Sequence, residues 1–224
     1  TFKVLDFPDL TVDGSFPLGA AVASIMIFYG GNPFLALIVA TAAGMGAGFI
    51  TGFLNTKGKI TGLLAGILTM TALYSINLRV MGRSNVTLLN AKTIFTYFEK
   101  WGIPRQWVFL TTFIIITVII KILLDSFLKT EVGFALRATG NNPNMARALG
   151  VNTEAMKILG LSISNGLVAL SGALVAQYQG FADIGMGVGT VVAGLASVII
   201  GEMIIGERKI GLATFSALLG SFIY

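Results

Sequence analysis

The 224-residue chain contains no cysteine and no histidine. Without these side chains it cannot build a Cys/His zinc site, a thiol nucleophile, a Ser-His-Asp triad or a histidine-ligated haem. The Walker A pattern G-x-x-x-x-G-K-[ST] is also missing, so these residues do not bind ATP through a P-loop. We therefore expect this chain to carry no catalytic residue, no metal site and no bound cofactor.

Charge is equally scarce. Only 11% of the residues are charged and 55% are apolar, whereas a soluble domain has about 25% charged residues. So few ionisable groups cannot cover a water-soluble surface, and membrane lipid is the expected surrounding. The net charge of +5 comes from basic residues scattered between apolar runs. This distribution argues against a nucleic-acid partner, because such proteins gather their basic residues on one face.

Long apolar runs fill most of the sequence. They are residues 14–56, 60–78, 107–128, 158–182, 184–201 and 210–224, and the first is long enough for two spans joined by a turn at residues 29–33. About 20 residues cross a bilayer as a helix, and a lipid-exposed backbone must satisfy its own hydrogen bonds. The sequence therefore predicts an all-α, polytopic membrane helical bundle with about seven apolar segments in a single domain, residues 1–224.

Three features of this topology are expectations. The chain lacks a starting methionine and stops inside an apolar run, so we expect it to be clipped at both termini. Residues 7–10 followed by residues 23–26 resemble residues 181–184 followed by residues 196–199, and the odd number of spans between them predicts an inverted-topology internal repeat. Chance similarity of apolar segments is the alternative. Residues 7–30 and 184–205 are also open to a re-entrant arrangement.

Glycines recur at four-residue spacing, at Gly44, Gly48 and Gly52 and again at Gly62 and Gly66. Such a stripe lets a neighbouring helix backbone approach closely. Close helix packing is therefore the first interpretation, and the lining of a permeation path is the second.

The basic residues indicate which end is cytoplasmic. Lys3, Lys57, Lys59, residues 129–157 and residues 208–209 supply nine basic residues to one side, against five within residues 79–105 on the other. The positive-inside rule makes the first side cytoplasmic. Residues 79–105 become an extracytoplasmic loop, with a short helix expected from Asn90 to Trp101. Its apolar face, expected on the membrane surface, consists of Ile94, Phe95, Phe98 and Trp101.

The most polar stretch, residues 129–157, contains a short helix with strong end signals. Asn142 is a good N-cap, Pro143 a good first helical residue and Gly150 a good terminator. The pattern predicts about two turns of helix outside the bilayer that present Asn144, Met145, Arg147 and Leu149. A docking element for a partner protein and an ordinary capped loop helix both fit these residues.

This stretch also carries a family resemblance. The run Gly133…Arg137-Ala138-x-Gly140-x-Asn142-Pro143…Ala146…Gly150 resembles the cytoplasmic coupling segment of bacterial ABC-importer permeases of the ribose and branched-chain amino-acid superfamily. Residues 6–19, DFPDLTVDGSFPLG, are similar to a narrower subgroup associated with tryptophan/tyrosine-type substrate-binding proteins. The superfamily often has Gly-Gly near Gly201-Glu202, where this chain has only Gly201, so no family role is transferred to Glu202.

The resemblance implies partners and a location. It implies a permease homodimer in the bacterial plasma (inner) membrane, an extracytoplasmic substrate-binding protein, and a separate cytoplasmic ABC ATPase that holds the ATP and magnesium. The ATPase-coupling residues that it implies are Asn142, Pro143, Asn144, Met145, Ala146, Arg147, Ala148, Leu149 and Gly150.

Five polar residues are candidates for a translocation path: Asp9, Asp13, Asn55, Asn77 and Asn165. The two aspartates lie beside Pro8, Gly14 and Pro17, where a helix is interrupted, and broken helices expose backbone groups that can bind a solute. Each of these side chains equally suits a bridge between helices. Lys121 and Asp125 are four residues apart and are expected to pair with each other.

Two functions remain at this point. The first is a permease that moves a small solute by alternating access, with an aromatic amino acid favoured by the resemblance and branched-chain amino acids or nucleosides left open. The alternative is an ion-coupled secondary transporter or channel. That alternative requires several acidic groups deep in the spans, and only Glu202 lies well inside one.

Overall fold

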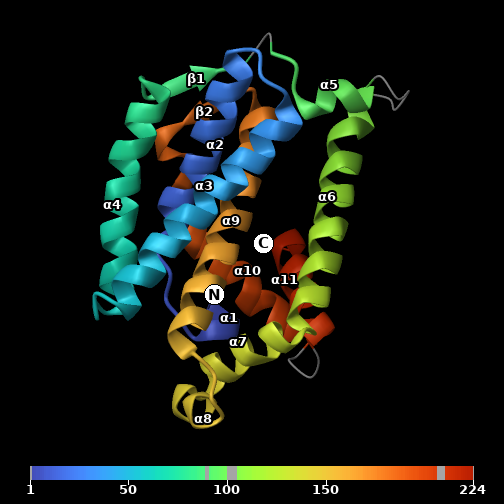
Figure 1. The fold of residues 1–224 in the computed structure, drawn as a ribbon. Coiled ribbons are helices and arrows are strands. Elements are labelled where there is room, and N and C mark those ends of the chain that lie inside the picture. Colours follow the sequence, from blue (N-terminus) through green and yellow to red (C-terminus); the bar gives the residue numbers. More distant parts are fainter. Residues whose placement is uncertain (1, 89–90, 100–104, 206–209, 224) are drawn as a thin grey trace.

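The computed structural model describes residues 2–88, 91–99, 105–205 and 210–223, and most of these are helical (Figure 1). The long helices are α2 (Val12–Phe28), α3 (Pro33–Thr56), α4 (Gly62–Met81), α6 (Arg105–Leu128), α9 (Thr153–Gln179), α10 (Thr190–Ile205) and α11 (Ile210–Ile223). The short elements are α1 (Phe2–Leu5), β1 (Asn85–Thr87), α5 (Ile94–Glu99), α7 (Glu131–Asn141), α8 (Pro143–Ala148), β2 (Phe181–Asp183) and the 3₁₀ helix η1 (Ile184–Gly187).

The structure confirms a polytopic helical bundle. Among the described residues, five helical segments are long and apolar enough to cross a membrane: Pro33–Thr56, Gly62–Met81, Trp107–Leu128, Thr153–Gln179 and Ile184–Ile204. Helix α2 is apolar but shorter, with 17 residues. The expected turn at residues 29–33 separates α2 from α3, where Asn32 caps α3 and Pro33 begins it.

Helices α2, α3 and α9 form the centre of the bundle, and α4 packs on α2 and α3. Helix α6 stands at the edge (Figure 1) and contacts α5, α7 and α11, and its Phe109 and Phe113 also pack against Tyr178 of α9. One end of the bundle carries α1, α7 and α8, and we call it the α8 end. The other end carries β1, β2 and α5, and we call it the sheet end.

The interior is built from small residues and the exterior from large ones. Alanines at positions 20, 21, 23, 36, 40, 65, 169, 173 and 176 are fully buried. Large apolar side chains are exposed on the outward faces of the helices, such as Ile38 and Phe49 of α3 and Ile122 and Leu123 of α6. Helix interfaces built from small residues, with bulky side chains facing outward, are typical of helices that pack in lipid.

The glycine stripes pack helices together, as the first interpretation predicted. A Cβ on Gly44 would meet Ala169 and the Asn165 backbone, one on Gly48 would meet the Leu161 carbonyl, and one on Gly52 would meet Ile158, all on α9. Gly62 and Gly66 similarly face Phe7 and Leu10. The stripes therefore bring α3 against α9 and α4 against the segment before α2.

Two local features differ from expectation. An antiparallel pair of three-residue strands, β1 and β2, joins the loop after α4 to the loop after α9 with Val86 opposite Ala182. Helix α5 spans only Ile94–Glu99, and Asn90 and Trp101 lie outside the described residues. Ile94 and Phe95 are buried within the protein, and Phe95 packs against Phe109 of α6 and Tyr178 of α9. This part of the expected face therefore contacts protein and not the membrane surface.

The two similar segments share one local detail. Asp9 Oδ1 accepts a hydrogen bond from the Thr11 backbone N–H (3.0 Å), and Asp183 Oδ1 accepts one from the Gly185 backbone N–H (2.7 Å). Each aspartate therefore closes a turn shortly before an apolar helix. The inverted relation between the two copies stays a prediction.

Candidate functional site

The segment between α6 and α9 is fixed by three side-chain caps. Thr130 Oγ1 accepts from Gly133 N–H (3.3 Å) at the start of α7, Asn142 Oδ1 accepts from Met145 N–H (3.0 Å) at the start of α8, and Asn152 Oδ1 accepts from Ala155 N–H (3.1 Å) at the start of α9. Gly150 has φ +85°, a left-handed conformation that suits glycine after a helix end. The predicted short helix is thus present as Pro143–Ala148 with the expected ends.

Helix α8 projects from the end of the bundle with one side held and the other exposed (Figure 1). Ala146 is buried, whereas Met145 is 62% exposed and Leu149 is 71% exposed. Arg147 is exposed but its Nε donates to Thr153 Oγ1 at 2.8 Å, which ties α8 to the first turn of α9. Asn144, Met145, Arg147 and Leu149 therefore face outward, as the sequence predicted.

The N-terminal residues link α7 to the centre of the bundle. Helix α1 packs so closely on α7 that a Cβ on Gly140 would collide with the Val4 carbonyl oxygen. Leu5 and Phe7 are buried with Leu136 of α7 and Leu161 of α9 in one apolar cluster. Helix α7 is therefore in direct contact with the segment that leads into α2.

A buried polar network follows directly after this cluster. Asn165 Nδ2 donates to Asp9 Oδ2 (2.7 Å) and to the Leu161 carbonyl (3.0 Å), and Ser15 Oγ donates to Asn165 Oδ1 (2.7 Å). Asn165 is fully buried and Asp9 is 7% exposed. Asn165 lies 12 residues after the start of α9, roughly 18 Å along the helix axis at 1.5 Å per residue. Helix α2 therefore begins near half the depth of the bundle.

Asp13, in the first turn of α2, holds the start of α10. Its Oδ1 accepts hydrogen bonds from Thr190 Oγ1 (2.8 Å) and from the Val191 backbone N–H (3.1 Å). Pro17 has no N–H to give to the Asp13 carbonyl, and Gly187 of η1 packs against that carbonyl and the Pro17 ring. Helix α2 is continuous from Val12 to Phe28, so the expected interruption beside Asp13, Gly14 and Pro17 is not present. The Asp13 carbonyl that Pro17 leaves without its helical N–H is instead a contact point for η1, which leads into α10.

Two substitutions of Asp13 distinguish its role as a hydrogen-bond acceptor from the effect of its negative charge. Asp13→Ala should destabilise the protein by about 1–2 kcal/mol, because the start of α10 loses its capping acceptor. Asp13→Asn keeps an acceptor oxygen in the same place, so its loss of stability should be less than about half of the loss caused by Asp13→Ala. The measurement is thermal unfolding of the purified full-length protein in one detergent. Equal losses in both variants would show that the charge, and not the cap, is what matters.

Of the two remaining candidates for the translocation path, Asn77 lies at the polar network and Asn55 does not. Asn77 Nδ2 donates to the Gly14 carbonyl (3.2 Å) from α4, and its buried Oδ1 has no hydrogen-bond partner among the described residues. Asn55 is not part of the network, because its Nδ2 donates to the Ile60 carbonyl (2.8 Å) in the turn between α3 and α4. Four of the five candidates therefore gather around the start of α2, and each of the four bridges two elements.

Polar residues outside this network fall into two groups, those that the sequence singled out and those that it missed. Lys121 Nζ and Asp125 Oδ2 form the expected pair at 2.7 Å. Glu202 lies on α10 and is not without a partner. Thr11 and Thr51, whose hydroxyls are 2.8 Å apart, join α2 to α3 and were missed. Isolated threonines in apolar runs give no distinctive pattern, because they equally bond to their own helix.

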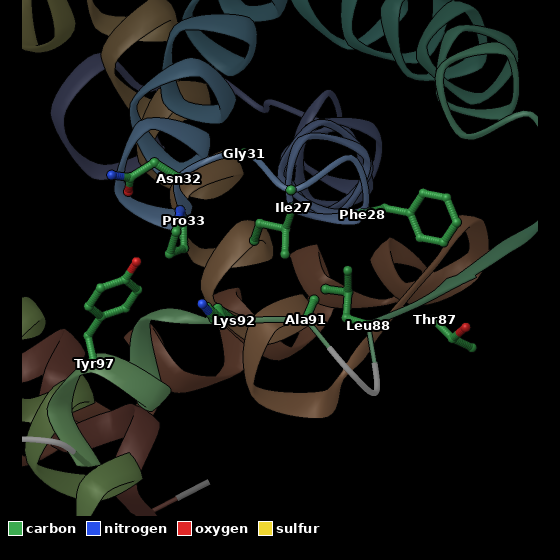
Figure 2. Close-up of a pocket in the computed structure, with 11 residues that line it drawn as sticks. Ile27, Phe28, Gly31, Asn32, Pro33, Thr87, Leu88, Ala91, Lys92 and Tyr97 are labelled. Carbon is green, nitrogen blue, oxygen red and sulfur yellow. The ribbon is translucent and has the colours of Figure 1, made fainter.

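The sheet end carries an open pocket of about 790 Å³. Figure 2 shows Ile27, Leu88 and Ala91 close together, with Tyr97 facing Pro33. The other lining residues are Phe28, Gly30, Gly31, Asn32, Thr87 and Lys92, of which only Lys92 is charged. The pocket thus offers aromatic and apolar surface beside one ammonium group.

Comparisons with known proteins match this chain to one family of transport proteins. The family described as "Branched-chain amino acid transport system / permease component" matches residues 1–224. A tyrosine transport system permease protein of Clostridioides difficile is 46% identical over 224 residues, which cover 100% of this chain and 73% of that protein. An uncharacterized protein of Rickettsia prowazekii is 42% identical over 91% of this chain and 70% of its own length.

A more distant relative is the ribose import permease protein of Bacillus subtilis, which is 30% identical over 86% of this chain and 59% of its own length. No solved structure matches the chain.

Proposed function

The chain belongs to the branched-chain amino acid transport permease family, and from that premise we propose that it translocates an aromatic amino acid by alternating access, driven by an ATPase that docks on α8. Members of this family are permease components of ABC importers and not enzymes. The helical bundle and the family make the chain a multi-pass membrane protein, which in bacteria lies in the inner membrane.

One observation carries the docking part of the proposal, namely the construction of α8. A six-residue helix is too short to be stable by itself, yet caps at Asn142 and Asn152, the stop at Gly150 and the Arg147–Thr153 hydrogen bond fix it at both ends. It nevertheless exposes Met145 and Leu149, two apolar side chains. A short helix that is fixed at both ends and exposes two apolar side chains suits a cleft on a partner protein.

The contacts inward from α8 support a route for movement. Helix α7 packs on α1, the cluster around Leu5 and Phe7 packs on α9, and Asp9 bonds to Asn165. This chain of contacts is continuous from the outer surface to the middle of α9. We propose that closure of the ATPase displaces α7 and α8 and thereby shifts the start of α2 against α9.

The solute assignment rests on the relatives and on polarity. The tyrosine transport permease of C. difficile, at 46% identity, favours an amino acid. The start of α2 lies inside the bundle with no side-chain cap on its first turn, and the Asn77 Oδ1 nearby lacks a partner among the described residues. An unpaired amide oxygen of this kind accepts hydrogen bonds and suits the ammonium group of an amino acid. Asp9, Asp13, Asn77 and Asn165 are the path residues that we propose.

The partners follow from the same role. The proposal includes a second copy of the permease, a cytoplasmic ATPase that holds ATP and magnesium, and an extracytoplasmic binding protein at the sheet end. Lys59, Arg147 and Lys157 line one cleft beside α8, Lys57 pairs with Glu154 of α9 next to it, and Lys129 lies between α6 and α7, so the α8 end gathers five basic residues. The positive-inside rule therefore supports a cytoplasmic α8 end. This sidedness also gives the ATPase access to α8.

The decisive experiment replaces two exposed residues, Arg147 of α8 and Leu149, the C-cap residue that follows it. The full-length protein and its Arg147→Asp/Leu149→Asp variant are purified from native membranes in mild detergent, and the accompanying proteins are identified by mass spectrometry. We expect a stoichiometric P-loop ATPase with the parent protein and at least a tenfold loss with the variant. Uptake of radiolabelled tyrosine into cells should fall with it.

A matched control variant makes the same change in charge at the sheet end, where one uncharged and one basic residue are replaced by aspartate. Tyr29→Asp/Lys92→Asp alters one exposed apolar and one exposed basic residue, and it should retain the ATPase. Absence of any ATPase from the parent sample, together with uptake into vesicles that lack ATP, would contradict the proposal and favour ion coupling. An ATPase retained by the α8 variant would contradict docking on α8 only.

A further inference from the structure

A small basic cleft lies beside α8, between the turn that joins α3 to α4 and the first turns of α9. Its volume is about 230 Å³, and it is lined by Asn55, Thr56, Lys59, Ile60, Thr61, Arg147, Thr153, Glu154 and Lys157. Pockets that enclose a whole small molecule are usually about 300–1,000 Å³. The cleft therefore suits one polar group of a larger ligand better than a complete solute.

The charge of the cleft is positive and unbalanced. Its single acid, Glu154, already pairs with Lys57 at 2.9 Å. Lys59 and Lys157 form no ion pair with any residue that the structure describes, and Arg147 Nε bonds to the Thr153 hydroxyl. Lys59, Lys157 and Arg147 thus line one space together with Thr56 and Thr61, and the Thr56 hydroxyl donates to the Gly52 carbonyl of its own helix.

The backbone brings Lys59 to this place in an unfavourable conformation. Its φ is +53°, in the left-handed region that residues other than glycine adopt only at a cost. The neighbouring Gly58 does not take up that conformation. The turn therefore presents a lysine side chain at a position where glycine would relieve the strain.

The surroundings place the cleft at the edge of the lipid-facing surface. Phe49, Ile50 and Phe53 are exposed on the last turns of α3, and Leu63 and Leu64 are exposed on the first turn of α4. These apolar side chains begin where the basic cleft ends and continue along both helices toward the middle of the bundle. A ligand that has an anionic head and apolar chains matches both surfaces at once.

We propose that this cleft binds the phosphate of an anionic phospholipid headgroup, held by Lys59, Lys157 and Arg147. The acyl chains lie against the exposed apolar residues of α3 and α4. Because Arg147 belongs to α8 and Lys157 to α9, a bound lipid joins α8 to the bundle. Arg147 also lies on the face of α8 that we propose for the ATPase, so the variants below leave Arg147 unchanged.

The test measures lipid binding to the full-length protein in phosphatidylcholine nanodiscs to which phosphatidylglycerol is added, with bound lipids counted by native mass spectrometry. Lys59→Gln/Lys157→Gln should weaken phosphatidylglycerol binding about thirtyfold, from about fivefold for each lysine near an anionic headgroup. Lys59→Arg/Lys157→Arg should retain binding, which separates lost charge from a folding defect.

The control variant Lys92→Gln/Lys129→Gln removes the same charge from two exposed lysines outside the cleft. It should change binding less than about twofold. An equal loss in both variants would overturn the proposal, because binding would then depend on overall charge alone. A second arm adds inorganic phosphate. If phosphate displaces the lipid at millimolar concentration and its own binding needs Lys59 and Lys157, the site is one for free phosphate and the lipid assignment is wrong.

A third result would also overturn it. If the glutamine variant binds phosphatidylglycerol normally but loses a copurifying ATPase, the cleft is a protein-docking surface.

Discussion

Asn165→Ala is expected to lower the free energy of unfolding by about 3 kcal/mol, one of the two largest effects that we predict. Asn165 Nδ2 donates to Asp9 Oδ2, and Asn165 Oδ1 accepts from Ser15 Oγ. A hydrogen bond between membrane helices contributes only about 0.6 kcal/mol on average. The larger value arises because the buried Asp9 carboxylate keeps only the Thr11 N–H as a hydrogen-bond partner among the described residues, and an unsatisfied charged group costs more than a neutral one.

Two further variants make this prediction specific. Asn165→Asp should be worse than Asn165→Ala, because it places a second carboxylate at hydrogen-bond distance from Asp9 in a buried site. Asn55→Ala is the control and should cost less than about 1 kcal/mol, because it removes one bond within a turn. The measurement is equilibrium unfolding in mixed detergent micelles. Similar losses at positions 55 and 165 would show that Asn165 is not the centre of a network.

Gly48→Ala should destabilise the bundle by about 2–3 kcal/mol. The added Cβ would collide with the Leu161 carbonyl oxygen and approach the Ser162 Cα within 2.8 Å, and both are backbone atoms of α9 that no side-chain rotation can move away. Inserting one methyl group into a well-packed interface typically costs about 1–3 kcal/mol. The two helices that share the most extensive contact in the bundle would have to separate.

The same helix supplies the control for this substitution. Gly46 lies two residues earlier, is exposed, and would place an added Cβ in open space, with no other atom within 4 Å. Gly46→Ala should stabilise α3 by about 0.5–1 kcal/mol, because alanine is the better helix former. Both proteins are compared by thermal unfolding and by uptake. A neutral Gly48→Ala would show that the contact with α9 relaxes easily.

The parts of the structure that the sequence predicted correctly share one property: their signals are local. The cap at Asn142 and the stop at Gly150 depend on a few neighbouring residues, so α8 was predicted with its correct ends. The spacing of Gly44, Gly48 and Gly52 predicted a packing face for the same reason. Low charge alone was sufficient for the membrane assignment.

The features that could not be predicted depend on distant contacts. The strands β1 and β2 have three residues each, too short for an alternating pattern, and they pair across almost a hundred positions. The apolar face of α5 was recognised, but no local signal distinguishes lipid from α6 and α9 as its partner. Asp9 and Asn165 were singled out separately, and only the fold brings them within 2.7 Å.

The small-residue interior has a consequence for protein engineering. Because fully buried positions such as Ala21, Ala65 and Ala173 carry almost no side-chain volume, the fit between helices is set by backbone shape, while the bulky exterior only has to dissolve in hydrocarbon. A water-soluble analogue should therefore be reachable by recoding exposed positions such as Ile38, Ile122 and Leu123 to glutamate, lysine or glutamine. The alanine and glycine seams would stay untouched, and the redesign would keep the helix order and the polar network.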